Sequence, residues 1–412
     1  MYQKFSKMGQ NYQGSPIDLN TEGLLPKNLS PIFLSIGEPH PHNIPSAKLQ
    51  LLSQDILLHQ PVTFKYGNSA GNEVLREYLL NIHKPLIPNL TLENILITSG
   101  STQGMDLLCK LLINPGDVCI VESPSYSNTF NTMKNYGADV VELPIDSDGL
   151  NPELLEETLI ELKRQGRSVK CVCIIPNAQN PSGVTLSGPR RIEIVELAKR
   201  YDFLIIEDDP YESLTFSNDK EKPMIANDEN LEYVMYLNSF SKIIAPGLRV
   251  GWMVAHREII HKLSMMKQST DCCSNPITQN MVASFCQKGW LEPHVEQVRR
   301  TYYQNKEVMM NSLRETFGHE SWATWTNPKG GMFVWMSLPP ELRDVDVLLH
   351  AQQQGVVFVP GHVFSPSFKY HHHIRLCFGY CQKHEIQEGI RRLRQAIDNA
   401  YLSMHIKDKA TI

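Results

Sequence analysis

The sequence predicts an α/β protein, with a mostly parallel sheet flanked by helices and a second, smaller α+β domain. The main observation is that short apolar, β-branched runs alternate with helical stretches from about residue 63 to residue 286. Such alternation is typical of parallel strands joined by helices that cover both faces of a sheet. The expected strands of this sheet are residues 94–98, 118–122, 139–143, 169–175, 203–207, 234–237 and 251–255.

A long polar stretch at residues 287–315 predicts one helix or a pair of helices that leads out of the sheet domain. The small domain is predicted by strand-like residues 329–337, 356–360 and 373–378 and by helical residues 345–354 and 384–401. Residues 1–30 form a polar arm without apolar periodicity. We therefore expect the arm and part of the small domain in residues 1–62, the large domain in residues 63–290, and the C-terminal small domain in residues 291–412.

Composition excludes several functional classes. The chain has 412 residues and a formal net charge of −5, so no basic footprint suggests nucleic-acid binding. No apolar run reaches the length of about 18 residues that a membrane span needs. The first 13 residues lack the apolar core of a signal peptide, and the first arginine is Arg76, which disfavours a transit peptide. These features predict a soluble, cytoplasmic protein.

The cysteines and histidines give no metal-binding pattern. The odd number of cysteines, nine, fits reduced thiols, and the adjacent Cys272 and Cys273 receive no role from the sequence. Three consecutive histidines, residues 371–373, have no acid or cysteine nearby at ligand spacing, and Arg375 follows at once. A polar turn before a buried strand is therefore favoured over a metal site, and no metal is expected.

Lys242 lies in the most informative stretch, residues 238–249, which reads Asn-Ser-Phe-Ser-Lys-Ile-Ile-Ala-Pro-Gly-Leu-Arg. A lysine amine can form a Schiff base with an aldehyde, and Ser239, Ser241 and Arg249 can hold a phosphate beside it. Pyridoxal 5'-phosphate (PLP) carries both an aldehyde and a phosphate. The stretch alone is only suggestive, because S-x-S-K also occurs in ordinary loops.

Asp208 is the candidate partner for the PLP ring nitrogen, because it follows an apolar strand at the end where open α/β sheets bind ligands. PLP needs a carboxylate there to keep its nitrogen protonated. Tyr211, three residues on, could reach the phenolic oxygen of the ring. The alternative is a strand end with solvated acids, in which Asp209 helps to start a turn before Pro210.

Two further loops follow expected strands. Residues 176–183 contain Asn180 before Pro181, which must be extended or in a turn and could point its amide into a site. Residues 97–107 pass from a strand through a Gly/Ser turn into a helix, whose first N–H groups form a ready phosphate site. A plain Pro/Gly loop and a helix cap without ligand remain the alternatives.

Taken together, these motifs resemble the fold-type I PLP-dependent aminotransferases. Within that superfamily the chain is most similar to the kynurenine/2-aminoadipate aminotransferase branch, which includes the C-terminal domains of MocR-type regulators. The resemblance covers about residues 30–395. It rests on S-G-S-x-Q-G, P-N-x-x-N-P-S-G, E-D-D-P-Y, S-F-S-K-x-x-x-P-G-L-R and K-G-G-M-F.

The resemblance implies a role for each matching residue. Lys242 would hold PLP and shuttle the proton, Asp208 would pair with the ring nitrogen, and Tyr211 and Asn180 would bond the ring phenolate. Tyr126 would stack on the ring. The phosphate would be held by Ser101, Thr102, Ser239, Ser241 and Arg249, although relatives often carry Gln where Thr102 lies.

The substrate and the neighbouring subunit receive the remaining roles. Arg375 would bind the α-carboxylate of the substrate as a bidentate fork, beside Gly37 and Asn180. Tyr66 would reach the phosphate of the cofactor in the neighbouring subunit. The resemblance thus implies a homodimer with shared active sites.

The predicted function is transfer of an amino group between an L-amino acid and a 2-oxo acid. Another PLP reaction, such as that of an amino-acid oxidase, hydroxylase or lyase, remains open, as does a non-catalytic PLP-binding sensor. The substrate side chain is not predicted. Residues 37–43 and the arm are the expected walls of its pocket, although a solvated loop explains His40, His42 and Asn43 equally well.

Overall fold

The structure is a computed structural model, and it describes residues 4–12, 14–15, 17, 25–217 and 220–410. Its larger sheet has eight strands in the order β2-β9-β8-β7-β6-β3-β4-β5. Neighbouring strands from β4 through β3, β6 and β7 to β8 are parallel, whereas β9 is antiparallel to both of its neighbours. The predicted mostly parallel sheet is confirmed. The strands are β2 (Ile95–Thr98), β3 (Val118–Ser123), β4 (Asp139–Asp146), β5 (Gly149–Leu150), β6 (Val169–Ile174), β7 (Leu204–Asp208), β8 (Val234–Ser239) and β9 (Gly251–Val254).

Helices cover both faces of this sheet, and the alternation of side chains along β6 shows how. Cys171 and Cys173 pack in one core with α4 (Ser101–Leu112), α5 (Ser127–Asn135) and α8 (Arg257–Asp271). Val172 and Ile174 point the other way, into the core that includes α6 (Pro152–Arg164) and α7 (Gly188–Tyr201). Because both faces are buried, the central strands are mostly apolar, and polar side chains gather toward their carboxyl ends.

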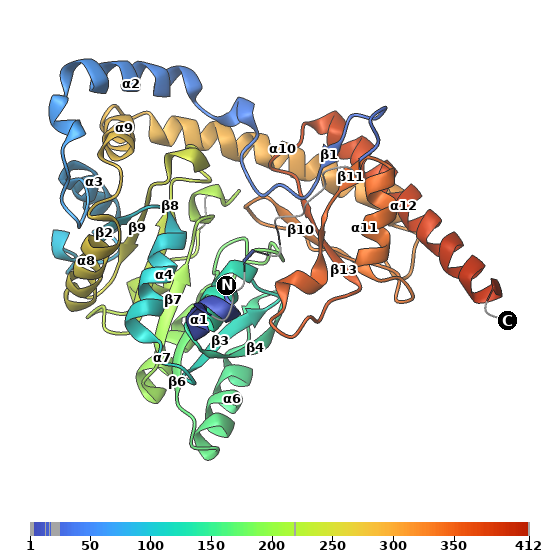
Figure 1. The fold of residues 1–412 in the computed structure, drawn as a ribbon, viewed down its shortest axis with the longest axis horizontal. Coiled ribbons are helices and arrows are strands. Elements are labelled where there is room, and N and C mark those ends of the chain that lie inside the picture. The colour runs from blue at the N-terminus through green and yellow to red at the C-terminus, as the bar shows by residue number, and fades with distance from the viewer. Residues whose placement is uncertain (1–3, 13, 16, 18–24, 218–219, 411–412) are drawn as a thin grey trace.

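The smaller sheet is antiparallel and has the order β10-β13-β12. Its strands are β10 (Phe333–Ser337), β12 (Val359–Pro360) and β13 (His373–Cys377), and its helices are α11 (Asp344–Gln353) and α12 (Lys383–Ala410). Helix α10 (Leu291–Phe317) runs from the part of the molecule with the larger sheet to the part with the smaller one (Figure 1). The polar stretch that predicted one helix or two is thus a single helix of 27 residues.

A short N-terminal strand joins the C-terminal part of the chain. Strand β1 (Ile32–Phe33) pairs in parallel with β11 (Val356–Val357). The proposed domain boundaries remain predictions, although this pairing fits the assignment of N-terminal residues to the small domain.

The remaining helices are α1 (Lys7–Asn11), α2 (Ser46–His59), α3 (Glu73–His83) and α9 (Pro276–Gln287), with short 3-10 turns η2 (Pro41–Asn43), η3 (Pro61–Phe64), η4 (Leu92–Asn94), η5 (Glu212–Leu214), η6 (Met224–Asn227), η7 (Pro246–Leu248) and η8 (Gly361–Phe364).

The polar arm expected at residues 1–30 is only partly described, and α1 lies within it. Across the described ranges, no helix is both long and apolar enough to cross a lipid bilayer.

Candidate active site

One cavity of about 520 Å³ opens at the carboxyl ends of β3, β6, β7 and β8 and at the start of α4. This volume is within the range of about 300–1,000 Å³ that small-molecule sites occupy. The cavity brings together all but one of the residues predicted for the site. They are Gly37, Ser101, Thr102, Tyr126, Asn180, Asp208, Tyr211, Ser239, Ser241, Lys242, Arg249 and Arg375.

Of the two adjacent acids, Asp208 is the one that lines the cavity. It ends β7, its side chain is buried, and its Oδ1 has no hydrogen-bond partner among the described residues. Burial raises the pKa of Asp208 to about 7, against the charge of Lys242, which lowers it. Asp209 points away from the cavity, and its Oδ2 accepts a hydrogen bond of 2.8 Å from Asn177 Nδ2.

Lys242 lies in the turn that follows β8, and its Nζ donates a 2.7 Å hydrogen bond to the carbonyl oxygen of Gly37. Burial lowers the pKa of this amine, while the nearby carboxylate of Glu38 acts in the opposite direction. A lowered pKa increases the share of neutral amine, the form that attacks an aldehyde and that accepts a proton.

A cradle for an anion lies beside Lys242. The Ser239 hydroxyl donates to Ser241 Oγ at 2.7 Å, and Arg249 Nη1 donates to the same Ser241 oxygen at 3.4 Å. Helix α4 begins here with Gly100 as its cap, and a glycine has no side chain that could accept from the first N–H groups of the helix. Gly100 has a φ of +78°, and a Cβ there would lie 2.4 Å from Arg249 Nη2, so a side chain would obstruct the cradle.

Arg375 also lines the cavity, and its side chain is almost completely buried. Its Cζ lies 4.3 Å from the ring centroid of Phe333 and 5.2 Å from that of Phe364. Nη1 donates to Asn180 Oδ1 at 3.0 Å and Nη2 to the Ser35 carbonyl at 2.6 Å. The planar guanidinium is therefore held in a fixed orientation, as two-point binding of a carboxylate requires.

Two tyrosines complete the interior. Tyr211 is buried and meets the ring of Phe333 edge-on at 5.9 Å. Burial raises the pKa of Tyr211, so its hydroxyl keeps its proton at neutral pH and can donate to an oxyanion. Tyr126, just after β3, is half-buried and its hydroxyl accepts from Asn128 Nδ2 at 2.9 Å.

These residues fit PLP. The partnerless Asp208 Oδ1 is buried, and an unsatisfied group of this kind costs about 1–3 kcal/mol. A protonated ring nitrogen would supply the missing donor and the compensating charge. The cradle around Arg249 suits a phosphate, and the Lys242 amine between cradle and carboxylate suits an aldehyde.

Tyr66 is the predicted residue that the structure does not bring into the cavity of its own chain. Its side chain is 88% exposed and lines a separate surface hollow with Phe64 and Cys273. That Tyr66 serves a neighbouring subunit remains a prediction.

The expected walls of the substrate pocket need a correction. Of residues 37–43, only Gly37 and Glu38 line the cavity, whereas His42 and Asn43 line another hollow. His40 lines neither, and its ring lies 5.8 Å from that of Tyr380. The arm does contribute, through Ile17. Other wall residues were not expected from the sequence, among them Phe33, Ser35, Ile36, Pro210, Phe333 and Val357.

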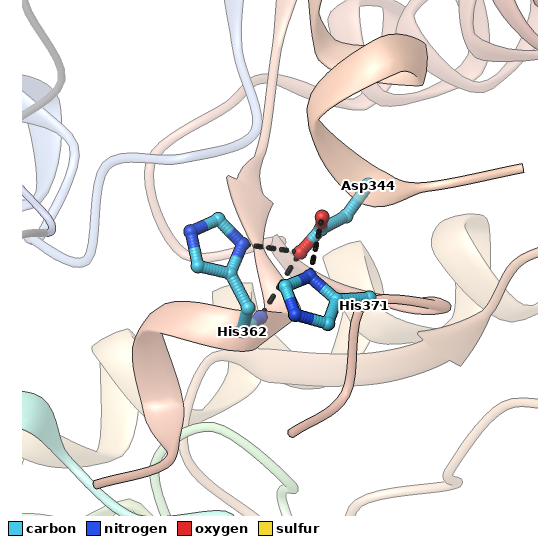
Figure 2. Close-up of side chains that lie close together, drawn as sticks. All are labelled: Asp344, His362 and His371. Carbon is cyan, nitrogen blue, oxygen red and sulfur yellow. Dashed lines mark hydrogen bonds and ion pairs between the residues drawn. The ribbon is translucent and has the colours of Figure 1, made fainter. Parts of the chain in front are cut away.

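Along the sequence His371 has no acid at ligand spacing, but the fold brings a distant acid close to it. Asp344, at the start of α11, lies with one oxygen 3.7 Å from His371 Nδ1 (Figure 2). No sequence signal connects these two residues, because they lie on different elements. Neither Asp344 nor His371 lines the active-site cavity.

The fold and the cavity together define a PLP-dependent enzyme. Residues 31–393 match the family model for aminotransferase class I and II. The chain is 38% identical over 369 residues to aromatic-amino-acid aminotransferase 1 of Thermococcus litoralis, covering 89% of this chain and 88% of that one. It is 31% identical to the 2-aminoadipate transaminase of Thermus thermophilus, covering 88% of each chain.

A solved structure agrees with these relatives. The kynurenine aminotransferase of Pyrococcus horikoshii, in complex with PMP, superimposes with a TM-score of 0.89 and 36% identity, covering 96% of this chain and 97% of that one. The chain belongs to the class I and II aminotransferase family. It is thus a PLP-dependent aminotransferase, which moves an amino group between an amino acid and a 2-oxo acid.

The first prediction concerns Lys242. We expect Lys242→Ala to retain PLP without a covalent bond and to lose turnover by at least about 10²-fold, because Lys242 is the one lysine in the described lining that can carry the proton. Borohydride reduction of the wild-type protein followed by peptide mapping should place the pyridoxyl group on Lys242. A label on another lysine would contradict the assignment.

The second prediction separates the two acids. Asp208→Asn should lower turnover by about 10²–10³-fold, because a neutral amide cannot hold a protonated ring nitrogen. Asp209→Asn, the matched control, should retain most of the turnover, since Asp209 faces Asn177 and not the cavity. Steady-state kinetics of both PLP-loaded variants, with folding checked by circular dichroism, measures the difference. A greater loss in Asp209→Asn would reverse the assignment.

Proposed function

We propose that the enzyme acts on amino acids with large, uncharged side chains, aromatic ones above all, rather than on acidic ones such as 2-aminoadipate. Relatives carry both kinds of name, so family membership alone does not choose between them. The supporting observation is the lining of the cavity, where an acidic side chain would meet Glu38 and apolar groups.

The cations of the cavity have other proposed duties. Lys242, Arg249 and Arg375 are the basic residues in the described lining. We assign them to the cofactor aldehyde, the phosphate and the substrate α-carboxylate. A second carboxylate at the end of a substrate side chain would therefore find no unassigned cation in the described lining.

Glu38 adds a charge of the wrong sign for an acidic substrate. Its side chain is exposed to the cavity, and no described residue forms a hydrogen bond or an ion pair with its carboxylate. Around it are Ile17, Phe33, Ile36 and Val357, which offer an apolar surface to a ring. Two like charges about 6 Å apart at an effective dielectric constant of about 20 repel by about 3 kcal/mol.

When bound, PLP supplies the aldehyde that amines attack and the electron sink that stabilises a carbanion. Arg375 binds the substrate carboxylate and so orients the α-carbon. The Lys242 amine, favoured in its neutral form by burial, removes the α-proton and later delivers it again. Asp208 holds the ring nitrogen in its protonated form, while Arg249, Ser239 and Ser241 hold the phosphate.

We also propose a homodimer in which Tyr66 completes the site of the other subunit. Four large apolar side chains that precede Tyr66 in the chain are exposed, and they come from α2 and η3: Leu51, Leu57, Leu58 and Phe64. We expect them to form one apolar surface of the kind that marks an interaction site. Figure 1 shows α2 at the periphery of the molecule, where a second copy has access.

The cytoplasmic location expected from the sequence is retained as part of this proposal. The number of cysteines is odd, and seven of the nine are buried, which fits thiols that stay reduced.

The third prediction tests the substrate class. We measure single-turnover reactions of the PLP-loaded enzyme with the amino donor alone. The ratio of the rate constant to Kd should be at least about tenfold higher for phenylalanine than for 2-aminoadipate. Glu38→Gln should raise the value for 2-aminoadipate by about tenfold or more, and should change phenylalanine less. Glu77→Gln, on the exposed face of α3, is the control for loss of a surface charge. Equal wild-type values for the two donors would contradict the proposal.

The fourth prediction tests the shared site. Lys242→Ala and Tyr66→Phe chains should each be impaired alone and should regain part of the activity when mixed under conditions of subunit exchange. In a heterodimer with shared sites, one site carries both lesions and the other carries none. Native mass spectrometry should first verify the exchange. No recovery in verified heterodimers, or an active monomer in sedimentation at the assay concentration, would count against the arrangement.

A further inference from the structure

Asp344, His362 and His371 form a compact cluster outside the active-site cavity. They come from three separate elements: the first residue of α11, the turn η8, and the loop before β13. The side chain of Asp344 is fully buried, while those of His362 and His371 are 20% and 34% exposed. Figure 2 shows both imidazole rings turned toward the single carboxylate. The carboxylate of Asp344 is therefore held inside the protein, while solvent can reach the two imidazoles.

The distances suit a common ion. His362 Nδ1 lies 2.6 Å from one oxygen of Asp344, and His371 Nδ1 lies 3.7 Å from the other. Two ligand atoms on a tetrahedral Zn²⁺, each at about 2.0–2.1 Å, are about 3.3 Å apart. The observed separations lie on either side of that value, so small rotations of the partly exposed imidazoles would bring each to it.

The ligand atoms of the three residues also converge on one place. One ligand atom from each of Asp344, His362 and His371 lies within 4.8 Å of the other two, so a single ion can reach all three. The exposed Arg343 places Nη2 3.4 Å from His371 Nδ1, at the outer side of the cluster. An imidazole binds a metal through an unprotonated nitrogen.

We propose that Asp344, His362 and His371 bind a divalent transition-metal ion of the zinc type, through the two Nδ1 atoms and the carboxylate. Two imidazoles and one carboxylate are a donor set that zinc prefers and that Mg²⁺ and Ca²⁺ do not. The backbone N–H of His362 already donates to the carboxylate at 3.0 Å and would fix its orientation in the bound state. The remaining coordination position faces solvent, where Arg343 would move aside.

The location indicates a structural role rather than a catalytic one. Turn η8 carries Phe364, whose ring packs against Arg375, and β13 carries Arg375 itself. A metal ion would connect α11 to both of these elements. It would therefore brace the wall that presents the guanidinium without touching the substrate.

The test uses the full-length, PLP-loaded protein without a histidine tag, treated with chelator and then titrated with Zn²⁺ in a calorimeter. We expect one ion per chain, with affinity at least about tenfold weaker in His362→Gln and in His371→Gln. His372→Gln is the matched control, because His372 lies in the same run but turns its Nδ1 to the Leu342 carbonyl. Co²⁺ in place of zinc should show the intense absorption of a tetrahedral site above about 500 nm, beyond the bands of the cofactor.

Three results would overturn the proposal. If His372→Gln weakens binding as much as His371→Gln, the ion is held by the exposed run of histidines. If the wild-type protein and the His362→Gln/His371→Gln double variant bind Zn²⁺ equally, the cluster is only a hydrogen-bonded clamp. A weak octahedral Co²⁺ spectrum would exclude the three-ligand geometry. The metal-free variants should keep the circular dichroism spectrum of the wild-type protein, because both substituted histidines are partly exposed.

Discussion

The burial of the larger sheet on both faces is the constraint on which the rest of the structure depends. A strand covered by helices on either side offers few positions for a polar side chain other than those toward its ends. The parallel strands β3, β6, β7 and β8 all end at the same edge, and polar or reactive residues follow each of them. Asp208 is the clearest case, because it is the last residue of β7 and its buried carboxylate lines the cavity. The site thus follows from the way the core is built.

Arg375 shows how the rest of the chain is attached to that edge. It lies on β13 of the smaller sheet, yet its hydrogen bonds go to Asn180, after β6, and to Ser35, in the N-terminal segment. A buried guanidinium needs these partners, since an isolated charge in the interior is strongly disfavoured. Three distant segments are therefore joined by one side chain. Any change in their relative placement would also change the orientation of the guanidinium.

Much of this could be predicted from the sequence because the relevant signals are local. Lys242, Asp208 and Asn180 each follow an apolar run, and their spacing matches known motifs. The pocket walls could not be predicted in the same way. Glu38 and Val357 line the same cavity because β1 pairs with β11, and no local sequence pattern predicts a strand of two residues. The same holds for Asp344 and His371, which approach through tertiary packing alone. His40, His42 and Asn43 adjoin a motif in sequence but turn away from the cavity in space.

The pairing of β1 with β11 has a consequence for biosynthesis. Ile32 and Phe33 leave the ribosome 324 residues ahead of their partners Val356 and Val357. Domains generally fold as they emerge, so the larger sheet can form while the N-terminal segment still has no partner. Ser35, Gly37 and Glu38 reach their places only when the smaller sheet has been made. A nascent chain can therefore carry its anion cradle and its lysine well before it has a closed substrate pocket, and the pocket is complete only after the residues of the smaller sheet have emerged.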